Sequence, residues 1–267
     1  MVLRFAFSVV LGLLTLAACG PAPQTAEPEE AQPGADIIWD EYGVAHIYAD
    51  DDLNGFYAYG WAQMHAHGSR ILELYGRARG RAAEYWGEPG LQADIVTRRL
   101  GFPALSAEWW AAMPADQQAK VTAFVRGMNA YAAAHPDQLS PAMQLVLPIE
   151  ETDPLAHLYQ IVHRAFMGWG SLETALSLSD PDEGGRPGSN AYAIAPSRSA
   201  SGNAMLVINP HLPWGDLFTW FEGQLEIPSQ SIYGVSLIGI PMVGIGFNEY
   251  GGWTHTVNEY DGVDIYE

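Results

Sequence analysis

The chain has 267 residues, of which 48% are hydrophobic and 16% are charged, so it can bury a substantial core. Its formal net charge at pH 7 is −19. Nonspecific nucleic-acid binding and direct electrostatic adhesion to anionic lipids both require a basic surface, and the charge argues against both. The sequence predicts a folded, acidic protein of one large or two small domains.

Residues 1–18 have the pattern of an export signal. Arg4 supplies the positive charge, and an apolar run too short to span a bilayer comfortably extends from Phe5 to Leu16. The following "LAAC" is similar to a bacterial lipobox, which predicts lipidation of Cys19, the only cysteine; a plain signal peptide is the alternative. We expect an exported protein on the periplasmic side of a bacterial membrane. The glycine after Cys19 favours the outer membrane.

Residues 19–36 are rich in Pro, Ala and Glu, a composition that predicts an extended acidic tether. Residues 37–170 are then predicted to form a mainly helical region. It opens with two short strands around the Asp-Glu-Tyr-Gly turn of "DIIWDEYGVAHIYAD". The apolar spacing predicts helices from Asp52, over 115–134, and from Asp153. The candidate caps are Asp51, Asp52 and Asp153, with Pro154 in the first turn of the third helix.

The character of the chain changes near Ser189. Residues 171–188 are predicted to be a spacer, and residues 189–267 contain short apolar runs separated by Gly, Pro, Ser and Asn. This strand-and-turn rhythm after a helical half predicts an α+β fold or a layered αββα arrangement.

Ser189 stands where the spacer meets the first of these strands, in "GGRPGSNAYAIAPS". The chain has no G-x-S-x-G elbow, so an α/β-hydrolase nucleophile is not supported. Cleavage between Gly188 and Ser189 would give Ser189 an α-amine, whose ordinary pKa is about 7.7–8.0. That amine can accept the hydroxyl proton and so activate the nucleophile. The alternative is an ordinary loop serine.

Three stretches carry a family resemblance. "GSNAYAIAPSRSASGNAMLVINPHLPW" resembles the start of the β chain of penicillin acylases, which are N-terminal-nucleophile hydrolases. "WDEYGVAHIYADDDLNGFYAYGWAQMHAHGSRILELYGRARGRAAEYWGE" resembles their α-chain opening, and "GFNEYGGWTHTVNEYDGVDIYE" resembles their second β-chain block. The similarity covers most of residues 37–267 and is greatest to the acyl-homoserine lactone and aculeacin acylase branch and to cephalosporin acylases. It implies an αββα sandwich, incomplete in this chain.

The resemblance also implies residue roles. Ser189 would be the autocatalytically exposed nucleophile with its α-amine as base, and His211 would orient both. The backbone N–H of Val257 would form half of the oxyanion hole, where one donor is worth roughly 2.7–4 kcal/mol. The other half is a family asparagine that would follow Glu267, near an arginine. We therefore expect the 267 residues to be either a fragment of a longer protein or a truncated, inactive product. The family's usual acidic residue is absent from "AHGSR" (66–70).

A calcium site is implied by the same resemblance. Asp261, the carbonyl of Val263, and Asp264 match calcium-binding positions, and Glu173 would supply the α-chain ligand. Oxygen ligands suit this hard cation, although a solvated acidic turn is the alternative. "HAH" (65–67) is not expected to bind a metal, because helical positions two apart point to different sides.

The expected function is hydrolysis of an amide that links an acyl chain to homoserine lactone or a similar amine. β-Lactam side-chain amides are the second candidate, and a truncated, non-catalytic lipoprotein of the same fold is the third. The chemistry is expected to require no cofactor, and the calcium ion implied by the resemblance would be structural. The expected partners are the small acyl amide and the α and β chains of one precursor, with no nucleic acid and with membrane contact only through the lipid. Trp214, Trp220, Phe221 and Phe247 are expected in the core, with some lining an acyl pocket.

Overall fold

A computed structural model describes residues 34–167 and 188–257. Its helices are α1 (Asp52–Ala78), α2 (Ala82–Trp86), α3 (Leu91–Arg99), α4 (Phe102–Ala112), α5 (Ala115–Ala134) and α6 (Asp153–Gln160), which continues as a π-helical segment, Ile161–Met167. Its strands are β1 (Ala35–Trp39), β2 (Ala45–Ala49), β3 (Gly188–Ile194), β4 (Met205–His211), β5 (Trp220–Ile227), β6 (Gln230–Leu237), β7 (Ile245–Phe247) and β8 (Gly252–Trp253).

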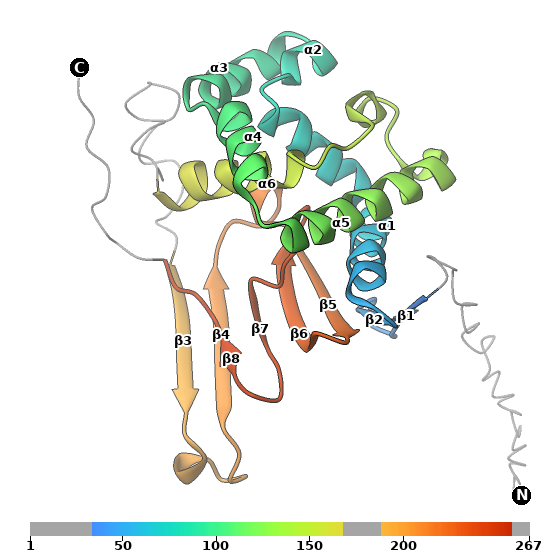
Figure 1. The fold of residues 1–267 in the computed structure, drawn as a ribbon. Helices are drawn as coiled ribbons and strands as arrows, with labels where there is room; N and C mark the ends of the chain where they lie inside the picture. Colours follow the sequence, from blue (N-terminus) through green and yellow to red (C-terminus); the bar gives the residue numbers. More distant parts are fainter. Residues whose placement is uncertain (1–33, 168–187, 258–267) are drawn as a thin grey trace, which may run out of the picture.

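Six of these strands form one sheet in the order β1-β2-β5-β6-β7-β8, and the helices lie over it (Figure 1). All neighbouring strands are antiparallel except the parallel pair β2–β5. Strands β3 and β4 form a separate antiparallel pair, here called the β3–β4 ribbon. The predicted α+β class is therefore confirmed. Within the described ranges, one helical layer and one main sheet of the expected sandwich are present.

The predicted strand pair at the start of the fold is confirmed by β1 and β2, and the helix predicted over 115–134 is α5. Asp51 caps α1 as predicted, since its carboxylate accepts the Asn54 N–H at 2.8 Å. The cap prediction for Asp153 was wrong: Thr152 is the N-cap residue of α6, and Asp153 is the first helical residue. Its carboxylate is engaged elsewhere, by Arg79.

Helices α1 and α5 make the closest contact in the helical layer. A Cβ added at Gly60 would lie 2.1 Å from the carbonyl oxygen of Phe124, and one added at Gly127 would lie 1.9 Å from that of Tyr57. Only glycine allows two backbones to approach this closely. The reciprocal glycines thus fix the crossing of the two helices over the sheet.

Buried polar side chains join the helical layer to the end of β6 and to the segment that follows it. The Tyr59 and Ser236 hydroxyls lie 2.7 Å apart, and Tyr75 donates to the carbonyl of Gly239 at 2.7 Å. Gln63 accepts the Gly239 N–H at 2.8 Å and donates to the carbonyl of Ile240 at 3.2 Å. Three of these bonds satisfy the buried N–H of Gly239 and the buried carbonyls of Gly239 and Ile240. They fix a segment that also lines the candidate site.

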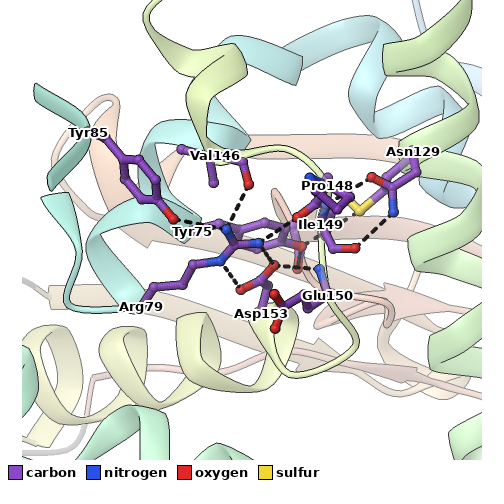
Figure 2. A network of polar contacts seen from close by, with 11 residues as sticks. Tyr75, Arg79, Tyr85, Asn129, Val146, Pro148, Ile149, Glu150 and Asp153 are labelled. Carbon is purple, nitrogen blue, oxygen red and sulfur yellow. Dashed lines mark hydrogen bonds and ion pairs between the residues drawn. The ribbon is translucent and has the colours of Figure 1, made fainter.

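Arg79, which follows the last residue of α1, joins this helix to α6 (Figure 2). Its Nε and Nη2 atoms donate to the two carboxylate oxygens of Asp153 at 2.7 and 2.5 Å. Nη1 and Nη2 also donate to the carbonyls of Val146 and Pro148 at 2.7 and 2.8 Å. Burial raises the pKa of Asp153, while the bonds from Arg79 and from the Glu150 N–H oppose that effect. The pair holds the start of α6 in place.

No helix in the described part of the chain combines the length and apolarity needed to cross a membrane.

Candidate functional site

Ser189 is the second residue of β3, and it pairs with Pro210 of β4. Neighbouring side chains on a strand point to opposite faces, so Ser189 and Pro210 share one face of the ribbon. Ser189 is half-buried, and its Oγ donates to the carbonyl oxygen of Gly188 at 2.5 Å. The hydroxyl therefore lies against the peptide bond that the sequence predicts to be cut.

Ser189 lines a cavity of 440 Å³, here called the Ser189 cavity. Its walls come from α6 and the π-helical segment, the ribbon, the adjoining ends of β5, β6 and β7, and the segment after β8. The lining residues are Leu158, Ile161, Val162, Phe166, Ser189, Pro210, Leu212, Trp220, Leu237, Ile240, Met242, Gly244, Ile245, His255, Thr256 and Val257. This set contains no Asp, Glu, Lys or Arg. A mostly apolar wall whose polar side chains are Ser189, His255 and Thr256 suits an uncharged, hydrophobic ligand.

Val257 reaches this cavity because the segment after β8 is held against Gly244. The Trp253 indole N–H donates to the Gly244 carbonyl at 2.9 Å, and His255 Nε2 lies 3.0 Å from the same oxygen. Both Val257 and Gly244 line the cavity with Ser189. The structure thus brings together two of the three residues for which the family resemblance implies catalytic roles.

His211, the third such residue, lies on the other face of the ribbon. It pairs with Gly188, and a Cβ built on Gly188 would be 3.9 Å from His211 Nδ1. Its Nε2 lies 2.5 Å from Asn209 Oδ1 and 3.3 Å from Asn190 Nδ2, and its side chain is exposed. Among the described residues no hydrogen bond joins His211 to Ser189. Its role in orienting the nucleophile stays a prediction.

Several predicted features lie outside the described residues. These are the lipidation site Cys19 with the signal, most of the tether and of the spacer, and the calcium ligands Glu173, Asp261, Val263 and Asp264. The last two residues of the predicted tether, Ala35 and Asp36, belong to β1. In residues 34–167 and 188–257, no group of three or more His, Cys, Asp or Glu side chains could hold a metal ion. His65 of the "HAH" stretch stacks on Trp61, with ring centroids 5.6 Å apart.

The aromatic residues divide between core, cavity and surface. Phe221 is buried and Trp220 lines the cavity, as expected. The expectation was wrong for Trp214 and Phe247, which are 103% and 52% exposed. Trp214 lies in the turn after β4, and Phe247 lies on the open face of the sheet, where its ring is 5.5 Å from that of Tyr233.

Sequence reasoning missed the contribution of α6 and the π-helical segment to the cavity. The lining positions Leu158, Ile161, Val162 and Phe166 are apolar, but the helical spacing does not show whether a partner element or a hollow covers them. The available signal was the apolar stretch "LYQIVHRAF" immediately before the polar spacer.

Comparison with known proteins identifies the family. The model of the penicillin amidase family matches residues 34–267. The chain belongs to this family. It is 28% identical over 284 residues to the acyl-homoserine lactone acylase PvdQ of Pseudomonas syringae pv. tomato, which covers 92% of this chain and 36% of the relative. It is 25% identical over 293 residues to aculeacin-A acylase of Actinoplanes utahensis, covering 95% and 37% respectively.

Among solved structures, the thermostable penicillin G acylase of Alcaligenes faecalis matches with a TM-score of 0.46 and 21% identity. The match covers 54% of this chain and 79% of that one. The chain therefore spans little more than a third of the length of the curated relatives above, 36% and 37%.

Proposed function

We propose that the protein is an amide hydrolase that removes the acyl chain from N-acyl homoserine lactones or similar acyl amides, with Ser189 as an N-terminal nucleophile. The observation that carries the proposal is the position of Ser189. Its hydroxyl lies at the edge of a 440 Å³ apolar cavity and 2.5 Å from the carbonyl oxygen of Gly188. The names of the relatives support an acyl amide as substrate.

The first step is self-cleavage. Ser189 Oγ attacks the carbonyl carbon of Gly188, and the peptide C–N bond breaks as the proton of the hydroxyl passes to the departing nitrogen. An ester then joins Gly188 to Ser189 Oγ, and water hydrolyses it. The products are a carboxylate on Gly188 and a free α-amine on Ser189. Because Ser189 is the second residue of a paired strand, the new terminus stays fixed next to β4.

The second step is turnover. The α-amine accepts the Ser189 hydroxyl proton as Oγ attacks the substrate carbonyl, and it then delivers that proton to the leaving amine. The backbone N–H of Val257 stabilises the negative charge that develops on the carbonyl oxygen. Water then hydrolyses the acyl-enzyme, releasing the fatty acid and regenerating Ser189. The acyl chain occupies the apolar cavity during both half-reactions.

Substrate class follows from the lining of the cavity. A cavity with no Asp, Glu, Lys or Arg in its described lining favours an uncharged aliphatic or aromatic acyl group. Release of homoserine lactone from N-acyl homoserine lactones, compared with release of phenylacetate from penicillin G, separates the favoured substrate from the β-lactam alternative. Higher kcat/KM for penicillin G would overturn the preference.

Processing provides the decisive test. Intact masses of the full-length protein should show cleavage between Gly188 and Ser189, and Ser189→Ala should remain one chain. Ser197→Ala, an exposed serine after β3, is the matched control and should be cleaved like the wild type. A wild-type protein that stays uncut would overturn the mechanism and leave the non-catalytic lipoprotein as the better description.

We also propose the lipid anchor on Cys19 and the calcium site of Asp261, Val263, Asp264 and Glu173. Labelling with radioactive palmitate should mark the wild type and spare Cys19→Ala. Dialysis against a calcium chelator should lower the Tm of the wild type, and Asp264→Asn should remove that difference. A chelator that leaves the Tm unchanged would exclude the structural ion.

A further inference from the structure

A hollow of 390 Å³ lies between the start of α1 and the neighbouring α5, and we call it the α1–α5 groove. It shares no lining residue with the Ser189 cavity. Alanine occupies positions 115, 119 and 123 of α5, which are four apart and therefore lie on one side of the helix. These small side chains leave the space open, and Trp110 of α4 adds an aromatic wall.

Two hydrogen-bond donors in the groove have no acceptor. Tyr57 is 7% exposed, and within residues 34–167 and 188–257 its hydroxyl has no hydrogen-bond partner. Burial raises the pKa of Tyr57, and the charge of Arg126 opposes that effect, so the guanidinium lies near this hydroxyl. A buried hydroxyl without a partner is costly, which favours a ligand that brings an acceptor into the groove. A carboxylate can accept from both donors.

The lining of the groove is positively charged, although the whole chain has a net charge of −19. Arg126 lines it, and no Lys, Asp or Glu does. In the described part of the chain no carboxylate forms an ion pair with Arg126. The carboxylates at the start of α1 are already engaged, since Asp52 pairs with Lys120 at 3.1 Å and Asp51 accepts from Asn54. The groove therefore fits an occupant that carries apolar groups and a carboxylate.

The chain enters the fold beside this groove. Gly34, the first described residue, accepts the Asp50 N–H at 3.0 Å, and a Cβ added to it would lie 2.5 Å from Asn54 Nδ2. Asn54 lines the groove. Residues 21–33, which precede Gly34, contain four prolines and three glutamates and no Lys or Arg. In a polyproline II conformation they would span roughly 40 Å, whereas positions 115–126 of α5 span only about 16 Å.

We propose that residues 21–33 of the same chain bind along the α1–α5 groove, with proline packed on Trp110 and a glutamate carboxylate accepting from Arg126 and the Tyr57 hydroxyl. Pro-rich segments bind aromatic-lined grooves because their extended conformation loses little entropy on binding. The position of Gly34, the length of the segment and its charge carry the inference. Bound in this way, the segment holds the folded body close to the lipid proposed on Cys19. The inference does not depend on the proposed hydrolysis.

The main experiment is limited proteolysis of the full-length protein with a glutamate-specific protease. Fragment masses report cleavage after Glu27, Glu29 and Glu30, and its rate follows the population in which the segment is released. Arg126→Gln and Tyr57→Phe should each raise that rate about tenfold, because each removes a hydrogen bond to a charged group. Arg99→Gln, at an exposed position at the end of α3, is the matched control and should leave the rate unchanged.

Two results of the proteolysis would overturn the proposal. One is a cleavage rate in the wild type equal to that of a synthetic peptide of residues 20–34, which would show that the segment is not bound. The other is an equal rate in the wild type, Arg126→Gln and Tyr57→Phe, which would show that it binds elsewhere. Arg126 is exposed, so its substitution is compatible with folding, and an unchanged Tm excludes general unfolding as the cause of faster cleavage.

A second pair of measurements tests the contact and the occupant. Replacing Glu27, Glu29 and Glu30 together by Gln should speed hydrogen exchange in residues 21–33 about as much as Arg126→Gln does. Combining the two changes should add little, because both remove the same interaction, and additive effects would overturn the pairing. Hydroxyl-radical labelling of Trp110 should increase when residues 21–33 are replaced by a Gly-Ser segment of equal length. Unchanged labelling would mean that another part of the protein covers the groove, and would also overturn the proposal.

Discussion

The unit of helices and main sheet differs sharply from the β3–β4 ribbon. In the unit, large side chains such as Tyr75 and Phe124 are fully buried. In the ribbon, Tyr192, Met205 and Val207 are 60%, 50% and 42% exposed. The described ribbon carries the candidate nucleophile at one end, while the unit holds most of the buried core. The two regions therefore separate chemistry from stability. Substitutions in the unit should change the free energy of unfolding, and a substitution at Ser189 should change the rate of the reaction.

The ribbon and the unit contact each other at two places. The side chain of Leu206 on β4 approaches β8, where a Cβ added at Gly252 would lie 2.8 Å from it. The Ser189 cavity is the second meeting place, with walls from both regions. The ribbon supplies the hydroxyl, and the unit supplies most of the apolar wall.

Ser189→Ala tests this separation with the largest expected effect. Loss of a nucleophile costs on the order of 10⁴–10⁶-fold in kcat. The variant should also remain uncut, since no hydroxyl is available to attack Gly188. Its circular dichroism should match that of the wild type, and its Tm should be no lower, because the intact chain keeps the constraint that cleavage removes. A large loss of Tm would show that Ser189 contributes to the core, which would contradict the separation of chemistry from stability between the two regions.

Asp153→Ala should have the largest effect on stability in the unit. The side chains of Asp153 and Arg79 are 2% and 11% exposed, so the substitution leaves a buried guanidinium without its carboxylate. Breaking such a pair from one side typically costs about 3–5 kcal/mol in the free energy of unfolding. Urea unfolding measures the loss.

Glu84→Ala is the matched control for Asp153→Ala. Glu84 pairs with Arg81 at 2.6 Å, but the two side chains are 58% and 42% exposed. Exposed pairs contribute roughly 0–1 kcal/mol. Equal losses in the free energy of unfolding of Asp153→Ala and Glu84→Ala would show that burial does not make one ion pair more important for stability than the other.

The elements with local signals were predictable from the sequence. Asp51 followed by an apolar helical stretch marked the start of α1, and the spacing of Val121, Phe124 and Met128 marked α5. The short helices α2 and α3 were not predicted individually, because each follows a turn and has few buried positions. Helices this short depend on tertiary contacts more than on propensity.

The candidate site was predictable only where a motif named the residue. Ser189 and Val257 came from family-like stretches, and the structure places both at one cavity. Leu158 and Val162, which line the same cavity, had no such signal, because the cavity also depends on β5 and β6. The spatial separation of His211 from the Ser189 side chain follows from strand register, which a single sequence does not specify.

The unit should also lose stability in acid through His157. Burial lowers the pKa of His157 to about 4, with Arg77 acting in the same direction, while the hydrogen bond to the Ile238 carbonyl and the charge of Asp216 oppose it. In the unfolded chain the pKa is close to 6.5, so between pH 6.5 and 4 the unfolded state binds more protons than the folded state. The stability contributed by neutral His157 is thus present above pH 6.5 and is lost as the pH falls.

The size of this effect is about 3 kcal/mol over that pH range, at 1.36 kcal/mol per pKa unit. His157→Gln keeps a donor for the Ile238 carbonyl but cannot titrate, so its unfolding free energy should fall less steeply between pH 6.5 and 4. Urea unfolding at several pH values gives both slopes. Identical slopes would show that folding does not lower the pKa of His157.

The smallest expected effect concerns the buried hydroxyl pair of Tyr59 and Ser236, which lies 2.7 Å apart between α1 and β6. Ser236→Ala should cost about 1–3 kcal/mol, because it leaves the Tyr59 hydroxyl buried without this partner. Tyr59→Phe combined with Ser236→Ala should cost less than the sum of the single changes, since neither hydroxyl then remains unsatisfied. Ser231→Ala, on the exposed part of the same strand, should change the free energy of unfolding by less than about 0.5 kcal/mol. Additive losses at Tyr59 and Ser236 would mean that each hydroxyl finds another partner, and that the polar bonds between helix and sheet act independently.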